Sequence, residues 1–155
     1  MYPAILTIHS WLRWATLLLA IGATLNAFRR DPLLSERMPG RQWDTLFMMA
    51  LDVQVLFGLL LYFGLSPLTK TAMNDFGAAM SDSGLRFWAV EHISMMLAAV
   101  VMVRVGRVLA LTAKTAAARR RRRLLLFAAT TAVIVAGIPW PGLDHGRRLF
   151  PPPLG

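Results

Sequence analysis

Cysteine is absent from this sequence of 155 residues. Its absence excludes disulfides, thiolate metal sites, iron–sulfur clusters and the covalent attachment of a c-type haem. Acidic residues are scarce as well, with 8 Asp and Glu against 17 Lys and Arg, and the net charge is +9. Nucleophile triads, phosphate-binding loops and helical zinc motifs are also missing. We therefore assign no catalytic residue.

Hydrophobic residues make up 56% of the chain and gather in four long runs. The mean hydropathy is +0.52, which is high for a soluble domain. A helix that spans a bilayer needs about 20 mainly apolar residues. We predict a single transmembrane domain over residues 1–155, an all-α integral membrane four-helix bundle, with helices at about 3–28, 43–64, 85–111 and 123–139.

Positive charge is concentrated in two of the three connections between these runs. The first connection holds four arginines between residues 29 and 41, and the third holds Lys114 and an arginine run at residues 119–123. Because loops rich in Lys and Arg stay in the cytoplasm, we expect both termini and the second connection on the outer (periplasmic) face. The predicted location is the bacterial inner (cytoplasmic) membrane, with a multi-pass topology.

The arginine run at residues 119–123 directly precedes an apolar run. This position indicates a topology signal in contact with anionic lipids of the bilayer, and no nucleic-acid partner is predicted. The second connection, residues 66–84, has enough Ala, Met and Phe to form a short interfacial helix. The Pro-rich C-terminal tail, residues 150–155, is expected to be extended.

Two histidines occupy matching positions in the first and third predicted helices. His9 lies six residues after Pro3, and His92 lies seven after Leu85. These helices run parallel, so a rise of about 1.5 Å per residue places both imidazoles at one depth near the outer face. Two such imidazoles can hold haem b between them, each giving one axial nitrogen, while each ring donates its other N–H to an acceptor.

Four neighbouring residues suit the same interpretation. Arg13 lies one turn deeper than the first histidine, where it could meet a haem propionate or Glu91. An ion pair between Arg13 and Glu91 is the structural alternative, and Glu91 is also a candidate acceptor for a histidine N–H, as is a backbone carbonyl one turn back. Met96 offers soft packing or a substitute ligand one turn below the second histidine. Gly58 would let a porphyrin approach the backbone.

Three further polar residues carry less specific signals. Asp52 and Gln54 lie near the middle of the second predicted helix. A polar contact between helices is their simplest interpretation, and a proton path or a quinone-binding edge are the alternatives. His145 lies in a polar stretch near the C-terminus, and we expect it to be solvated.

Four stretches of the sequence resemble a known family. They are HSWLRW (residues 9–14), GLLLYF (58–63), LRFWAVEHISMM (85–96) and IPWP (138–141). They are similar to small four-helix bacterial membrane proteins of the cytochrome b-like family, and the resemblance covers nearly the whole chain. It implies haem b and electron transfer. A more distant resemblance, to the copper-resistance D-like group of membrane proteins, implies copper or haem handling.

The leading functional hypothesis is a b-type cytochrome-like electron-transfer protein with one haem near the outer face. It would be an electron carrier or a subunit of an oxidoreductase complex rather than a stand-alone enzyme. One haem near one face cannot carry charge across the bilayer alone. A quinol, a periplasmic electron carrier or a larger membrane complex must therefore provide the rest of the electron path. The alternatives are a non-catalytic structural subunit of a respiratory or photosynthetic complex, and a copper or haem handling protein.

Overall fold

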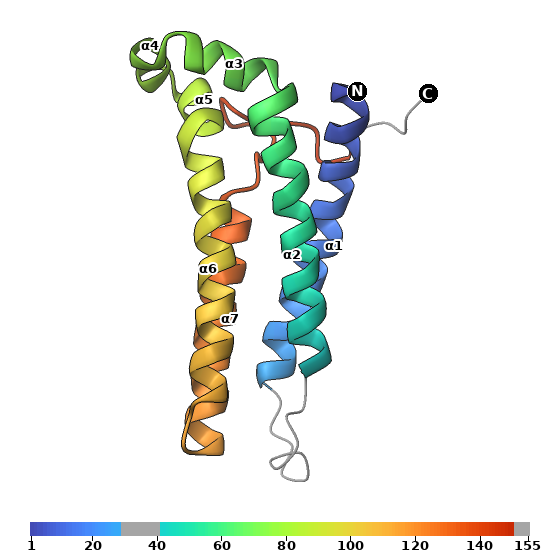
Figure 1. The fold of residues 1–155 in the computed structure, drawn as a ribbon, viewed down its shortest axis with the longest axis vertical. Coiled ribbons are helices and arrows are strands. Elements are labelled where there is room, and N and C mark those ends of the chain that lie inside the picture. Colours follow the sequence, from blue (N-terminus) through green and yellow to red (C-terminus); the bar gives the residue numbers. More distant parts are fainter. Residues whose placement is uncertain (29–40, 151–155) are drawn as a thin grey trace.

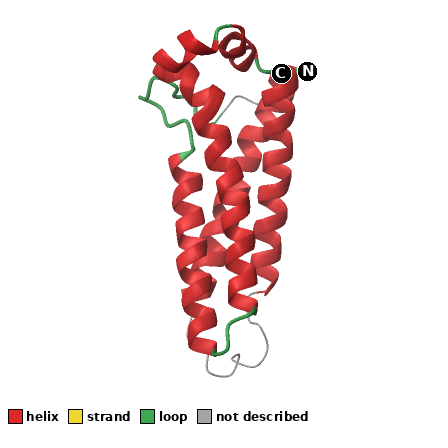
Figure 2. Ribbon diagram, turned by 60° about the vertical axis from the view of Figure 1, so that its left-hand side comes forward, coloured by secondary structure: helices red, strands yellow, loops and turns green. Residues whose placement is uncertain are grey.

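The computed structural model describes residues 1–28 and 41–150, which are mainly helical, and no strand occurs among them. Figure 1 shows the long helices, α1 (Tyr2–Phe28), α2 (Arg41–Leu60), α6 (His92–Leu111) and α7 (Ala116–Ala136). They lie side by side along the long axis of the molecule (Figure 2). Helix α1 packs against α2 and α7, and α6 packs against α7 and, less closely, α2. Most of the arginine-rich first connection and the tail beyond residue 150 lie outside the described residues.

Three of the described stretches are long and apolar enough to cross a membrane, namely Tyr2–Phe28, Gln42–Leu65 and Ser83–Leu111. Many of their large apolar side chains point outward, which suits contact with lipid rather than with water. These features indicate a membrane protein. Helix α7 is of similar length, but the arginine run occupies its early turns and its apolar part falls short of a full span.

The fourth long helix departs most from its predicted bounds. It begins at Ala116 rather than near residue 123, because the Thr115 side chain accepts a hydrogen bond from the Ala118 N–H at 3.1 Å and caps the first turn. Arginine is a good helix former, so the helix continues through the charged run. It ends at Ala136, before residue 139, because Pro139 cannot continue the helix and restricts the residue before it.

The second connection contains three short helices, where the sequence predicted one. They are α3 (Pro67–Asn74), α4 (Phe76–Ser81) and α5 (Ser83–Arg86), and each begins after a side chain that accepts a backbone N–H. Ser and Asp are favourable caps because their oxygens satisfy donors that a helix start leaves unpaired. The connection therefore folds as a helical layer across one end of the long helices (Figure 1).

Two π-helical turns lie where α2 and α6 meet this layer. The turn η2 (Leu61–Leu65) follows α2, and η3 (Phe87–Glu91) directly precedes α6. The Tyr62 hydroxyl donates to the Ala89 carbonyl at 2.7 Å and joins the two turns. A π-turn rotates the residues that follow it relative to a regular α-helix. The turn η3 therefore helps to set the direction in which the first residue of α6 points.

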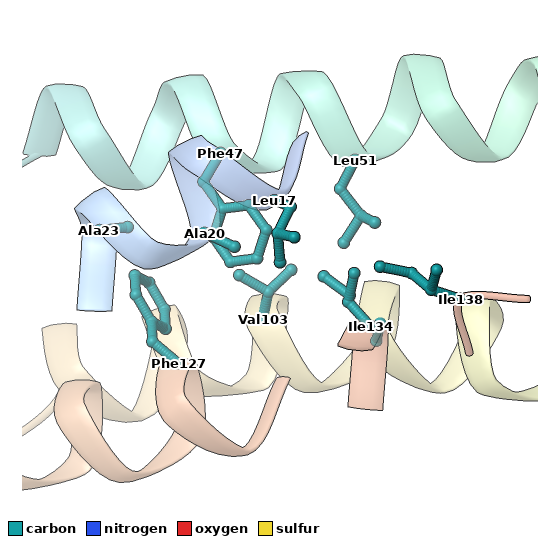
Figure 3. Packing of buried hydrophobic residues seen from close by; sticks show 10 residues of the cluster. Leu17, Ala20, Ala23, Phe47, Leu51, Val103, Phe127, Ile134 and Ile138 are labelled. Carbon is teal, nitrogen blue, oxygen red and sulfur yellow. The ribbon is translucent and has the colours of Figure 1, made fainter. Parts of the chain in front are cut away.

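The apolar core lies between the long helices (Figure 3). Its large members include Phe47 of α2, Val103 of α6 and Phe127 of α7, all fully buried. The rings of Phe47 and Phe127 meet edge to face, with their centres 6.0 Å apart. A Cβ atom on Gly106 would lie only 2.8 Å from the Cβ atom of Leu126, so a glycine is needed for the close approach of α6 to α7.

A buried ion pair ties three helices together at the end of the molecule far from His9. Arg123 of α7 donates from Nε to Asp44 Oδ1 of α2 at 2.9 Å, and from Nη2 to Asn26 Oδ1 of α1 at 3.1 Å. The Arg123 and Asp44 side chains are only 11% and 12% exposed. The last arginine of the charged run therefore turns inward to a carboxylate of its own chain, and the predicted lipid contact does not describe it.

Candidate functional site

A cavity of about 460 Å³ lies at the end of the molecule where α1 begins, bordered by α1, α2 and α6. This volume is within the range of cofactor sites, roughly 300 to 1,000 Å³. Its lining is mainly apolar. Five of the six residues that the sequence suggested as cofactor contacts line the cavity: His9, Arg13, Gly58, His92 and Met96.

The two predicted haem-ligating histidines lie next to each other in this cavity. His9 comes from α1 and His92 is the first residue of α6. Their ring centres are 6.3 Å apart, and the ring planes are inclined by 75°. Residues 83 positions apart in the chain are thus placed together by the parallel course of α1 and α6. Their role as metal ligands stays a prediction.

A backbone carbonyl fixes the orientation of His92. Its Nδ1 lies 2.8 Å from the carbonyl oxygen of Gly137, which directly follows α7. The last carbonyls of a helix have no partner within the helix, so this oxygen is free to accept the imidazole N–H. When Nδ1 carries the proton, the Nε2 lone pair is available for a metal. The sequence pointed to Glu91 or a carbonyl one turn back as the acceptor, whereas the acceptor lies on another helix.

His9 is held between a glycine and an amide of α2. Its Nε2 lies 3.2 Å from Nε2 of Gln54, so the predicted polar contact between helices is confirmed for Gln54. The His9 Nδ1 atom and the Gln54 Oε1 atom are buried without a hydrogen-bond partner among the described residues. A Cβ atom on Gly58 would lie 3.2 Å from Cε1 of His9. The glycine therefore provides room for the imidazole itself.

Arg13 contacts the C-terminal part of the chain, a contact that was not predicted from the sequence. Its Nη2 donates to the carbonyl oxygen of Leu149 at 2.7 Å, and Trp14 Nε1 donates to the same oxygen at 3.1 Å. The Nε atom of Arg13 is buried and has no hydrogen-bond partner among the described residues. The Arg13 side chain is thus held at the cavity, which it lines, by the C-terminal part of the chain.

The predicted ion pair between Arg13 and Glu91 is not formed. Glu91 instead accepts from Nε of Arg86 at 2.8 Å, and both side chains are partly exposed. The reason is local, because these two residues are five positions apart across η3, and π-helical geometry brings such residues to the same side of the helix. Glu91 is also absent from the described lining of the cavity, and its predicted contact with a cofactor receives no support from this placement.

The C-terminal segment, defined here as residues 137–150, crosses from the end of α7 to the start of α1 (Figure 1). Arg147 lies 4.4 Å from the ring centre of Trp88 and contacts the Tyr2 hydroxyl at 3.4 Å. Phe150 stacks on Trp14, with ring centres 5.3 Å apart. The segment therefore covers the cavity, and sequence reasoning missed it because only the helix-stopping prolines signalled a change of direction.

His145 is part of this segment and is half-buried, whereas the sequence predicted a solvated side chain. Its ring stacks on Phe87 at a centre distance of 3.6 Å, with the planes only 8° apart. Phe87 in turn lies 5.7 Å from the His92 ring. His145 thus supports the packing around the site without lining the cavity.

The charged groups around the cavity all have one sign. Arg13, Arg147 and Arg148 line it, and no Asp or Glu occurs in the part of the lining that the structure describes. Guanidinium groups with free donors attract carboxylates and other anions. The cavity is therefore suited to a largely apolar ligand that carries negative charge.

Comparisons of the chain with protein-family models, with curated proteins and with solved structures find no match. Within residues 1–28 and 41–150, no group of three or more His, Asp or Glu side chains comes together in a way that could hold a metal ion.

Proposed function

We propose that this chain is a b-type cytochrome-like membrane protein that binds one haem b in the cavity and transfers electrons. The observation that carries the proposal is the pair of neighbouring imidazoles, His9 and His92, with ring centres 6.3 Å apart. Two metal–nitrogen bonds of about 2 Å, with each nitrogen roughly 1 Å from its ring centre, require ring centres about 6 Å apart. The spacing is thus compatible with two axial ligands on one iron.

The hydrogen bonds of the two rings agree with this role. The Gly137 carbonyl accepts from His92 Nδ1 and leaves Nε2 for the iron. For His9, an amide turn that brings Gln54 Oε1 to Nε2 would let the imidazole donate a hydrogen bond to that oxygen. Gln54 would then orient one ligand as Gly137 orients the other.

The charge of the lining favours haem over the other candidate ligands. Haem b carries two propionates, and the guanidinium groups of Arg13, Arg147 and Arg148 line the cavity. A neutral quinone would leave this positive charge without a counterion, and a copper ion would be repelled by it. Two imidazoles also suffice for a haem iron, because the porphyrin provides its other four nitrogens.

When bound, the haem would supply one-electron exchange. The residues of the chain bind and orient it and exclude water. Met96 and Gly58 shape the wall of the cavity, and the C-terminal segment covers it. Because a single haem serves only one face, the electron must arrive from or leave to a quinol, a periplasmic carrier or a larger complex.

An optical spectrum tests the function. The full-length protein, purified in mild detergent, is expected to show a Soret band that shifts and sharpens on reduction, together with an α band, after expression with haem supplied. A protein that stays colourless after incubation with haemin would overturn the proposal. If that colourless protein purifies with a large complex, the structural-subunit alternative is favoured.

We further propose that the four long helices all span the bacterial inner membrane, with both termini and the cavity on the outer face. The support is the arginine content of the first and third connections. A reporter fused after Gly155 is expected to be external, and one inserted near Pro39 internal, as read by paired alkaline phosphatase and fluorescent-protein fusions. Opposite readings at both positions would reverse the topology and place the histidines on the cytoplasmic side.

A further inference from the structure

An ion pair faces outward from the middle of the membrane-spanning helices. Arg104 of α6 donates from Nη2 to Asp52 Oδ1 of α2 at 2.6 Å. Their side chains are 42% and 46% exposed. The pair is a polar contact between helices, as predicted for Asp52, but it lies on the outer surface of the helices rather than between them.

The depth of this pair makes its exposure costly. Asp52 lies close to the midpoint of the Gln42–Leu65 span. Arg104 also donates from Nη1 to the carbonyl of Val100, one turn closer to the start of α6, so its guanidinium points toward the middle of the helix rather than toward its nearer end. A charge in the centre of a bilayer costs about 2.5 to 3.5 kcal/mol even by insertion scales. A protein surface over the pair would remove this contact with lipid.

The residues one helical turn from the pair form an apolar border. Met49 and Leu56 flank Asp52 on α2, and each is more than half exposed. Val101 and Val108 flank Arg104 on α6 in the same way. Spacings of three and four residues place them on the same helix faces as the charged pair. We call these six residues the α2/α6 strip: Met49, Asp52, Leu56, Val101, Arg104 and Val108.

We propose that the α2/α6 strip is the interface of a homodimer. A two-fold axis beside the pair brings Asp52 of one copy to the partner's Arg104, and the reverse, so that four charges alternate in sign around the axis. The strip carries both members of the pair, so it is complementary to itself, as an isologous interface requires. The apolar border excludes lipid and water from these charges. The inference uses only the membrane location and does not depend on haem.

Single-cysteine cross-linking tests the interface directly, because the natural chain has no cysteine. Leu56→Cys and Val101→Cys are expected to give a band at twice 17.2 kDa when native membranes are treated with a flexible bismaleimide. The matched control is Leu18→Cys, which is 68% exposed on α1, a helix that contributes no residue to the strip. We expect cross-linking at the strip to exceed the control at least about tenfold, the ratio that corresponds to 1.4 kcal/mol.

Exchange of the two charges in the Val101→Cys variant tests whether Asp52 and Arg104 hold the dimer together. Asp52→Arg and Arg104→Asp should each abolish the Val101→Cys cross-link when expressed alone. The double exchange should restore it, and so should co-expression of the two single variants. Circular dichroism of each variant checks that the helices form.

Equal cross-linking at Val101→Cys and Leu18→Cys would overturn the proposal. So would a strip that cross-links only to a different protein, or a cross-link that survives both single exchanges in folded protein.

Discussion

His92→Ala is expected to abolish the low-spin haem spectrum, and His9→Ala is expected to do the same. Each variant would remove one of the two imidazoles that are proposed to hold the haem, and an alanine methyl group cannot replace an imidazole as a ligand. The remaining histidine would provide only one nitrogen to the iron. The haem-to-protein ratio after purification, with the reduced-minus-oxidised spectrum, measures the loss.

His145→Ala is the matched control, because His145 stacks on Phe87 near the site but does not line the cavity. It should leave the haem spectrum intact. Gln54→Leu provides a second, finer comparison. It should retain haem but change the reduction potential, because it removes the amide that contacts His9. Retention of the low-spin spectrum in either His9→Ala or His92→Ala would contradict bis-histidine ligation.

Asp44→Ala is expected to lower the free energy of unfolding by about 3 kcal/mol, at the low end for breaking a buried ion pair. The carboxylate of Asp44 receives two hydrogen bonds from Arg123, and both side chains are nearly buried. Its removal takes the counterion from a guanidinium that links α7 to α1 and α2. Unfolding in mixed detergent and sodium dodecyl sulfate, followed by circular dichroism, measures the difference.

The comparison variant for this experiment is Glu91→Ala, which breaks the pair with Arg86. Both of these side chains are partly exposed, and exposed pairs contribute only about 0 to 1 kcal/mol. If Asp44→Ala and Glu91→Ala lower the free energy of unfolding equally, burial does not determine the strength of the Asp44 pair. The proposed role of this pair in holding α1, α2 and α7 together would then be wrong.

The long helices could be predicted from the sequence because their signal is local. Apolar runs of spanning length specify helices whose backbone groups pair within the segment. The meeting of His9 with His92 could be predicted as well, because equal depth on parallel helices follows from the helical rise alone. The contact of Gln54 with another helix could also be predicted, since a polar residue in an apolar run indicates a partner on another helix.

The polar contacts that finish the site could not be predicted in the same way. The acceptor for His92 is the backbone carbonyl of Gly137. Every residue has such a carbonyl, so the residue types do not indicate which one accepts. The partner of Arg13 is another carbonyl, that of Leu149, reached only because the chain turns back after α7. Glu91 pairs with Arg86 rather than with the predicted Arg13 because of a π-turn. Hydrophobic periodicity does not distinguish π-helical from α-helical turns.

The C-terminal segment has a consequence for biosynthesis. Arg147 and Arg148, which line the cavity, and Leu149, whose carbonyl holds Arg13, are translated after all four long helices. During synthesis at about 5 to 20 residues per second, the helices can enter the membrane before the cover of the cavity has left the ribosome. His9 and His92 can therefore meet while the cavity is still open. The part of the lining that this segment contributes is therefore the last to be made.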